Sequence, residues 1–150
     1  MTDIDPVLAR IGEGIGLNQQ GDRAGARTLF AEVWTEIGSD GDPLHRCALA
    51  HSMADVQDDP REELAWDERA LAAAELISDE RAAEAGVAFP VRAFYPSLHL
   101  NLGDVHHRLG HRDEALRHLE LGRAAVGALG DDGYGAMIRD GLDRLAERLG

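Results

Sequence analysis

The stretch that decides the fold is LGDVHHRLGHRDEALRHLELGRAA, residues 102–125. Around its first half, apolar residues recur at every third or fourth position, as on one face of a helix: Leu98, Leu102, Val105 and Leu109. Gly110 then provides a helix stop, and a second apolar stripe begins at Ala115. The stretch therefore predicts two helices joined by a tight turn.

Asp-Pro pairs mark the starts of further helices. An Asp side chain accepts hydrogen bonds from the first free backbone N–H groups, and Pro fits the first helical position. Such pairs stand at residues 5–6, 42–43 and 59–60. Asp22 provides a similar cap, and it lies 37 residues before Asp59, the same distance that separates Asp5 from Asp42. This interval predicts a repeat of helix pairs, which a third pair continues after an offset of 52 residues.

The expected architecture is all-α, with a single domain over residues 1–150. No segment shows the alternating pattern of a strand. We expect helix pairs at about 5–38, 42–77 and 96–129, and a C-terminal capping helix at 134–149. Residues 78–95 form an irregular segment, in which we expect a short helix followed by a bend.

These helix pairs resemble the tetratricopeptide repeat, in which two helices cross at small residues and a bulky residue follows shortly after. The third pair carries the likeness through Leu102, Gly103, Gly110, Ala115 and Leu119, and the first pair through Gly14, Gly21, Ala26 and Phe30. The whole chain is also similar to small stand-alone tetratricopeptide-like proteins of high-GC bacteria. The resemblance implies a right-handed α-α superhelix of three helical hairpins plus the capping helix. It implies no particular activity.

Composition excludes several classes of partner and location. The formal net charge is −13, and the basic residues are fifteen arginines with no lysine. Such a charge repels phosphate backbones, so we expect no nucleic acid partner. A single cysteine, Cys47, fits a reducing compartment. The sequence has no basic and apolar leader and no apolar run near 18 residues, so we expect a cytoplasmic protein without a membrane partner.

The middle repeat is polar where the helices of a pair cross. The repeat offsets align His51, Glu63 and Asp67 with Gly14, Ala26 and Phe30 of the first pair and with Gly103, Ala115 and Leu119 of the third. Because a carboxylate buried alone costs several kcal/mol, we expect these three groups and Asp55 to pair with one another. Nearby carboxylates raise the pKa of an imidazole, so we expect His51 to be protonated near neutral pH.

Three interpretations of this polar cluster stay open. In the first, the cluster is a structural hydrogen-bond network that includes Arg46 or Arg69. In the second, it lines a ligand pocket. In the third, it is a metal site to which Cys47, His51 and Asp55 contribute at helical spacing. Its spacing matches no specific metal motif, so we assign no metal ligand, no cofactor and no catalytic residue. We expect Cys47 itself to be a small buried thiol.

In the superhelix that the resemblance implies, the first helix of each pair lines a concave groove. The groove positions of the family are Leu8, Ile11, Ile15, Asn18 and Gln19, then His45, Ala48, Ser52 and Asp55, then Ser97, Leu100, Asp104, His107 and Arg108. With the polar cluster, the predicted partner-binding residues are His45, His51, Ser52, Asp55, Glu63, Asp67, Ser97, Asp104, His107 and Arg108. We therefore predict non-catalytic binding of a protein or peptide segment, with Arg108 available for a carboxylate.

Two alternatives differ in class. One is a small metal-dependent or ligand-binding protein or enzyme built on the polar cluster, and the other is a homodimer formed through apolar end faces. Outside the cluster, His99 and His106 are seven residues apart and thus about 10 Å apart along a helix, too far for one metal ion unaided. We expect them to be hydrogen-bonded structural histidines. Tyr95 either covers one end of the groove or packs at the bend.

Overall fold

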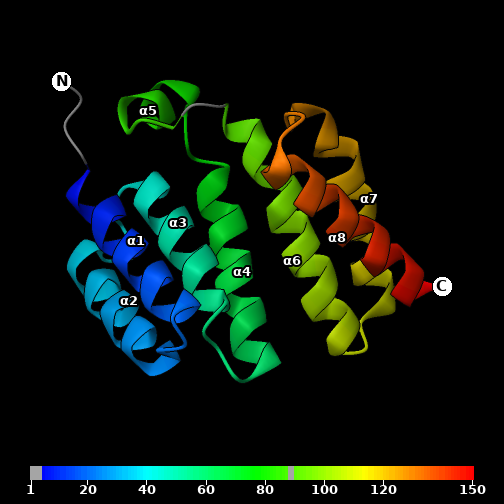
Figure 1. The fold of residues 1–150 in the computed structure, drawn as a ribbon, viewed down its shortest axis with the longest axis horizontal. Coiled ribbons are helices and arrows are strands. Elements are labelled where there is room, and N and C mark those ends of the chain that lie inside the picture. The colour runs from blue at the N-terminus through cyan, green and yellow to red at the C-terminus, as the bar shows by residue number, and fades with distance from the viewer. Residues whose placement is uncertain (1–4, 88–89) are drawn as a thin grey trace. The chain divides into compact units, whose positions relative to one another are not determined.

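A computed structural model describes residues 5–87 and 90–150, and Figure 1 shows that these residues fold into helices. They form two compact units, which we call unit 1 (Met1–Ala88) and unit 2 (Phe89–Gly150). No residue in the described ranges lies in a strand, which confirms the predicted all-α class. None of the described helices has the length and apolar content needed to cross a membrane.

Unit 1 contains two helix pairs and a short helix. Its elements are α1 (Pro6–Gln19), α2 (Arg23–Ile37), α3 (Pro43–Ala54), α4 (Pro60–Ala74) and α5 (Asp79–Glu84). Helix α1 packs against α2, and α3 packs against α4 and also contacts α1 and α2. The start of every helix in the two pairs is confirmed, because the side chains of Asp5, Asp22, Asp42 and Asp59 each cap one of them.

The close crossing of α1 and α2 depends on a glycine. A β-carbon at Gly14 would lie only 2.3 Å from Cε1 of Phe30, so a larger residue does not fit against that ring. Phe30 is 1% exposed and belongs to a core that includes Leu49 and Val56 of the second pair. The small residue expected at the crossing is thus confirmed in the first pair.

The second pair ends three residues earlier than predicted. Helix α4 stops at Ala74, and the backbone N–H of Ile77 bonds to the Ala74 carbonyl at 3.2 Å in a turn. Ser78 then caps α5 by accepting from the backbone N–H of Arg81 at 3.1 Å. Ser78 is extended, so α4 and α5 are separate helices. The short helix expected in the irregular segment is confirmed.

Unit 2 contains the third pair and the capping helix. Its elements are η1 (Val91–Phe94), α6 (Tyr95–Arg108), α7 (Arg112–Ala125), η2 (Val126–Ala128) and α8 (Gly133–Leu149). Gly110, with φ of 81°, ends the turn after α6 as predicted. Helix α8 packs on both α6 and α7. A β-carbon at Gly103 of α6 would lie 2.7 Å from Cδ2 of Leu145 in α8. Glycine therefore allows close packing of helices in this unit as well.

Candidate functional site

The polar cluster of the middle repeat is partly assembled in unit 1. Asp55 interacts electrostatically with both His51 and Glu63, which places it near each of them. Asp67 is 2% exposed, and both of its carboxylate oxygens are shielded from solvent. The pairing of Asp67 with His51 or Glu63 stays a prediction.

The predicted charge of His51 is wrong. Burial lowers the pKa of this imidazole, and the nearby charge of Asp55 only partly opposes that effect. His51 is therefore neutral near pH 7, because the free energy lost when a charged imidazole is buried exceeds the stabilisation that the charge of Asp55 provides. Burial likewise raises the pKa of Asp55, although its side chain remains exposed and solvent reduces the effect.

The arginines near this cluster differ from those expected. Arg23 of α2 donates to the backbone carbonyls of Asp55 at 3.0 Å and Gln57 at 2.6 Å, so it holds the turn between α3 and α4. Arg46 instead donates to the carbonyl of Gly41 at 2.7 Å. Arg69, the other candidate, lies over the ring of Trp66 at 4.4 Å. The role of Arg23 was not predicted from the sequence, because this residue lies 32 residues before the turn that it binds.

His45 belongs to an ion network at the helix starts of unit 1. Its Nε2 lies 2.7 Å from Asp5 Oδ2, and Arg81 of α5 donates to Asp42 at 2.7 Å and to Asp5 at 3.3 Å. Burial acts to raise the pKa of both carboxyls, but their hydrogen bonds outweigh it and lower the pKa of Asp5 and of Asp42. The predicted groove residue His45 is thus engaged within its own unit.

The groove positions of the third pair are also largely engaged. Ser97 is buried and donates to the carbonyl of Phe94 at 3.2 Å. Asp104 binds Arg108 at 3.1 Å and Arg148 of α8 at 3.0 Å. Among the predicted positions, Ser52 is buried as well, whereas Asp55, His107 and Arg108 keep exposed surface.

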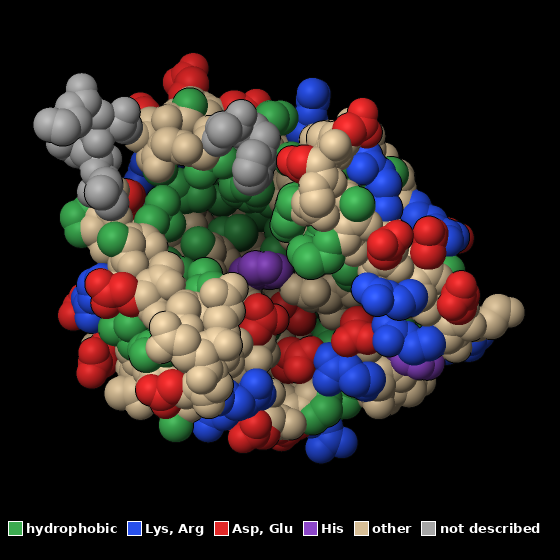
Figure 2. All heavy atoms as spheres, in the orientation of Figure 1, with side chains coloured by type: hydrophobic (Ala, Val, Ile, Leu, Met, Phe, Trp, Pro, Cys, Tyr) green, Lys and Arg blue, Asp and Glu red, His purple; other side chains and the backbone are tan. Residues whose placement is uncertain are grey.

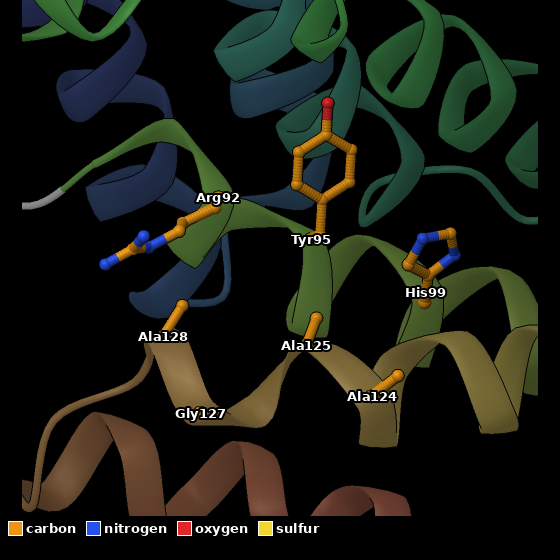
Figure 3. A pocket seen from close by; sticks show the side chains of 7 residues that line it. All are labelled: Arg92, Tyr95, His99, Ala124, Ala125, Gly127 and Ala128. Carbon is orange, nitrogen blue, oxygen red and sulfur yellow. The ribbon is translucent and has the colours of Figure 1, made fainter.

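A pocket of about 430 Å³ lies in unit 2 (Figure 3). Arg92, Tyr95 and His99 come from η1 and α6, and small residues of α7 and η2 line the opposite side: Ala124, Ala125, Gly127 and Ala128. The rings of Tyr95 and His99 stack with centroids 6.1 Å apart. The pocket thus combines one cation, two rings and a floor of small side chains. Of its residues, sequence reasoning had singled out only Tyr95 and His99.

Four histidines form a second cluster in unit 2. His99 and His118 approach to 3.0 Å between their Nδ1 atoms, and so do His106 and His111. The prediction that His99 and His106 are hydrogen-bonded is confirmed, but their partners were not foreseen. Burial, with the charge of Arg117 as the next cause, lowers the pKa of His118 to about 4. His118 is therefore neutral at physiological pH.

Comparisons with known proteins bear on the helix pairs. The family model of the tetratricopeptide repeat matches residues 7–32 and 96–120, within the first and third pairs. No curated protein and no solved structure matches the chain. The middle pair, which has His51 and Asp67 at the aligned positions, lies outside both matched ranges. The resemblance inferred from the sequence is confirmed for the two pairs that have glycine at the crossing.

Proposed function

Because this is a tetratricopeptide-like chain, with repeat matches at residues 7–32 and 96–120, we propose that it is a non-catalytic module that binds a segment of a partner protein. Helical repeats present extended surfaces that suit such binding. We assign the contact to the pocket of unit 2. The observation that carries this assignment is its lining, which includes an arginine and two rings but no carboxylate, in a chain with 28 acidic residues.

Charge is distributed unevenly along the chain. Residues 1–88 carry seven arginines and nineteen acidic residues, a formal charge of −12, whereas residues 89–150 carry eight arginines and nine acidic residues, a formal charge of −1. Figure 2 shows arginine and acidic side chains interspersed over α6–α8. The charges of unit 2 itself therefore repel an anionic segment much less than those of unit 1 do.

The pocket lining indicates the chemistry of the bound segment. The guanidinium of Arg92 can hold a carboxylate through two parallel hydrogen bonds. Tyr95 offers a rigid ring to an adjacent apolar or aromatic side chain of the segment. The tyrosine side chain loses little conformational entropy when it is bound. The small residues on the opposite side leave room for that side chain. We propose a segment with an acidic side chain or a free C-terminus next to an aromatic or aliphatic residue.

Selection from a random peptide library on the purified full chain tests this proposal. We expect the selected peptides to share a carboxylate beside an apolar side chain. Arg92→Glu should weaken their binding about ten- to hundredfold, since hydrogen bonds to a charged group contribute about 1.5–3 kcal/mol. Arg144→Glu is the matched control, because it makes the same charge change at an exposed arginine of α8 outside the pocket. Equal losses in both variants, or peptides without a carboxylate, would contradict the proposal.

Pairing of two copies is a second candidate function. Tyr134 and Met137 of α8 are three residues apart on one helical face and are 44% and 56% exposed. This exposed apolar pair on the capping helix provides a contact surface for a second copy. Light scattering over a range of concentrations measures the mass directly. A dimer that Met137→Glu dissociates supports this candidate, and a monomer at every concentration rejects it.

A further inference from the structure

Three potential metal ligands meet where α6 faces α7 in unit 2. His106 comes from the last turn of α6, and Glu114 and His118 stand four residues apart on one face of α7. One ligand atom from each residue lies within 4.8 Å of the others. The rings of His106 and His118 are nearly parallel, with an interplanar angle of 7° and centroids 5.5 Å apart. Residues from two helices therefore converge on one small volume.

The contacts around His118 fix which of its nitrogens is available. Its Nδ1 lies 3.0 Å from Nδ1 of His99, so a hydrogen bond occupies that side of the ring. Nε2 faces the side chain of Arg117 at 3.4 Å. A metal-binding histidine usually has its other ring nitrogen held by a second group, and the contact with His99 provides that group here.

A cation already occupies part of this volume. Nη2 of Arg117 lies 2.7 Å from Glu114 Oε2 and 3.4 Å from His118 Nε2. The side chain of Arg117 is 57% exposed, so it can move into solvent without disturbing the core. The guanidinium therefore marks a position between carboxylate and imidazole that favours positive charge and that an ion would take over.

We propose that His106, Glu114 and His118 bind a divalent transition metal ion, with Zn²⁺ as the best match. Two imidazoles and one carboxylate form a donor set that zinc accepts, with a fourth position open to water. Tetrahedral zinc places its ligand atoms about 3.3 Å apart. The three ligand atoms lie within 4.8 Å of one another, so each pair must approach by at most about 1.5 Å. Glu114 is exposed, so its carboxylate can move toward the two buried imidazoles.

The ion would connect the two helices of one hairpin. His106 precedes the turn at Gly110, whereas Glu114 and His118 follow it, so binding links α6 to α7. His99 would act as a positioning residue, because its bond to Nδ1 orients the ring of His118. A ligand that binds only the folded chain raises its stability. Zinc binding should therefore increase the melting temperature.

Zn²⁺ titration of the full chain, purified without a histidine tag and stripped with a chelator, tests the site. We expect one ion per chain by calorimetry and a higher melting temperature with Zn²⁺ than without it. Co²⁺ offers a spectroscopic readout, since its visible absorption bands report the number and kind of ligands. No binding, or binding of several ions with no stoichiometric end point, overturns the proposal.

Substitutions then locate the ion. Glu114→Gln should weaken Zn²⁺ binding at least about tenfold, and because Glu114 is exposed this variant is expected to fold. His118→Gln should do the same, but its burial makes Glu114→Gln the decisive variant if His118→Gln does not fold. Glu120→Gln, at an exposed acid of the same helix, and His107→Gln, next to His106 but partly exposed, are matched controls that should bind as the wild type does.

Arg117→Ala provides an opposite test. It removes the cation that competes for Glu114 and His118, so Zn²⁺ should bind several-fold more tightly. A purely structural cluster, or adventitious binding elsewhere on the surface, gives no such increase. Unchanged or weaker binding in Arg117→Ala, or equal losses in Glu114→Gln and His107→Gln, overturns the proposal.

Discussion

The first and middle helix pairs of unit 1 follow the same repeat but differ in what lies at the helix crossing. In the first pair, Gly14 leaves space for the ring of Phe30. In the middle pair, the aligned positions are His51 and Asp67, of which Asp67 is 2% exposed. Both pairs are helical hairpins. The same hairpin therefore accepts a glycine and a phenylalanine at these aligned positions in one pair, and a histidine and a buried carboxylate in the other.

This difference shows that two properties of a repeat are set independently. The positions of the helices depend on caps, turns and apolar stripes, which both pairs have. The chemistry of the crossing depends on a few positions. Polar residues can replace apolar ones there when each buried polar group has a hydrogen-bond or charge partner. Substitutions at the aligned positions and in the ion network at the helix starts test the two properties separately.

Phe30→Ala should have the largest effect. It removes a ring that is 1% exposed in the core of unit 1, and such changes cost about 3–5 kcal/mol. Urea unfolding with tryptophan fluorescence measures the loss, because Trp34 lies in the same core. A loss below about 1 kcal/mol would show that the ring does not hold the crossing together.

Gly14→Ala should destabilise by about 1–3 kcal/mol, because its β-carbon would press on a buried and rigid ring. Gly12→Ala is the matched control. A β-carbon at position 12 would meet nothing within 4 Å, so alanine there should stabilise α1 by up to about 1 kcal/mol. Equal effects of the two substitutions would contradict close crossing at Gly14.

His51→Ala should cost about 1–2 kcal/mol, within the range typical of single substitutions, because the half-buried ring lies beside Asp55. Thermal unfolding measures the cost. His107→Ala of α6 serves as the control, since this side chain is partly exposed. If His51→Ala leaves the stability unchanged, the polar crossing is no structural network and binding of a ligand there becomes the better interpretation.

Arg81→Gln should have the smallest effect, about 1 kcal/mol or less at neutral pH. The lowered pKa of Asp5 and Asp42 means that their ionised forms stabilise the fold above their ordinary value of 3.8. This contribution disappears as the pH falls through the lowered folded-state values. The difference between variant and wild type in thermal unfolding should therefore shrink in acid. A difference that persists at pH 2 would assign the role of Arg81 to packing instead.

The helices were predictable because their signals are local. Each cap joins an Asp side chain to a backbone N–H two or three residues away, as for Asp5 with Val7 and Leu8. The apolar stripes likewise repeat within one or two turns. The predicted end of α4 was three residues too late, because the apolar pattern continues to Ile77. The prediction did not take into account that Ser78 can cap the next helix, α5.

The candidate sites were less predictable because they join distant residues. His45 was assigned to an open groove, whereas it lies against Asp5, 40 residues away. His118 was not considered, and its spacing of four residues from Glu114 was the signal that could have drawn attention to it. The pocket residue Arg92 lies in the segment expected to be irregular, where no periodic pattern shows its direction.

The sequence alone therefore determined the helix pairs, their order and the glycines at two crossings, because hydrogen bonds within a helix, caps and turns depend on neighbours a few residues apart. Only the tertiary structure decided which polar groups meet. The pairs His99 with His118 and Arg81 with Asp42 are 19 and 39 residues apart. Their contacts exist because helix packing brings those faces together, and packing depends on the summed burial of many side chains.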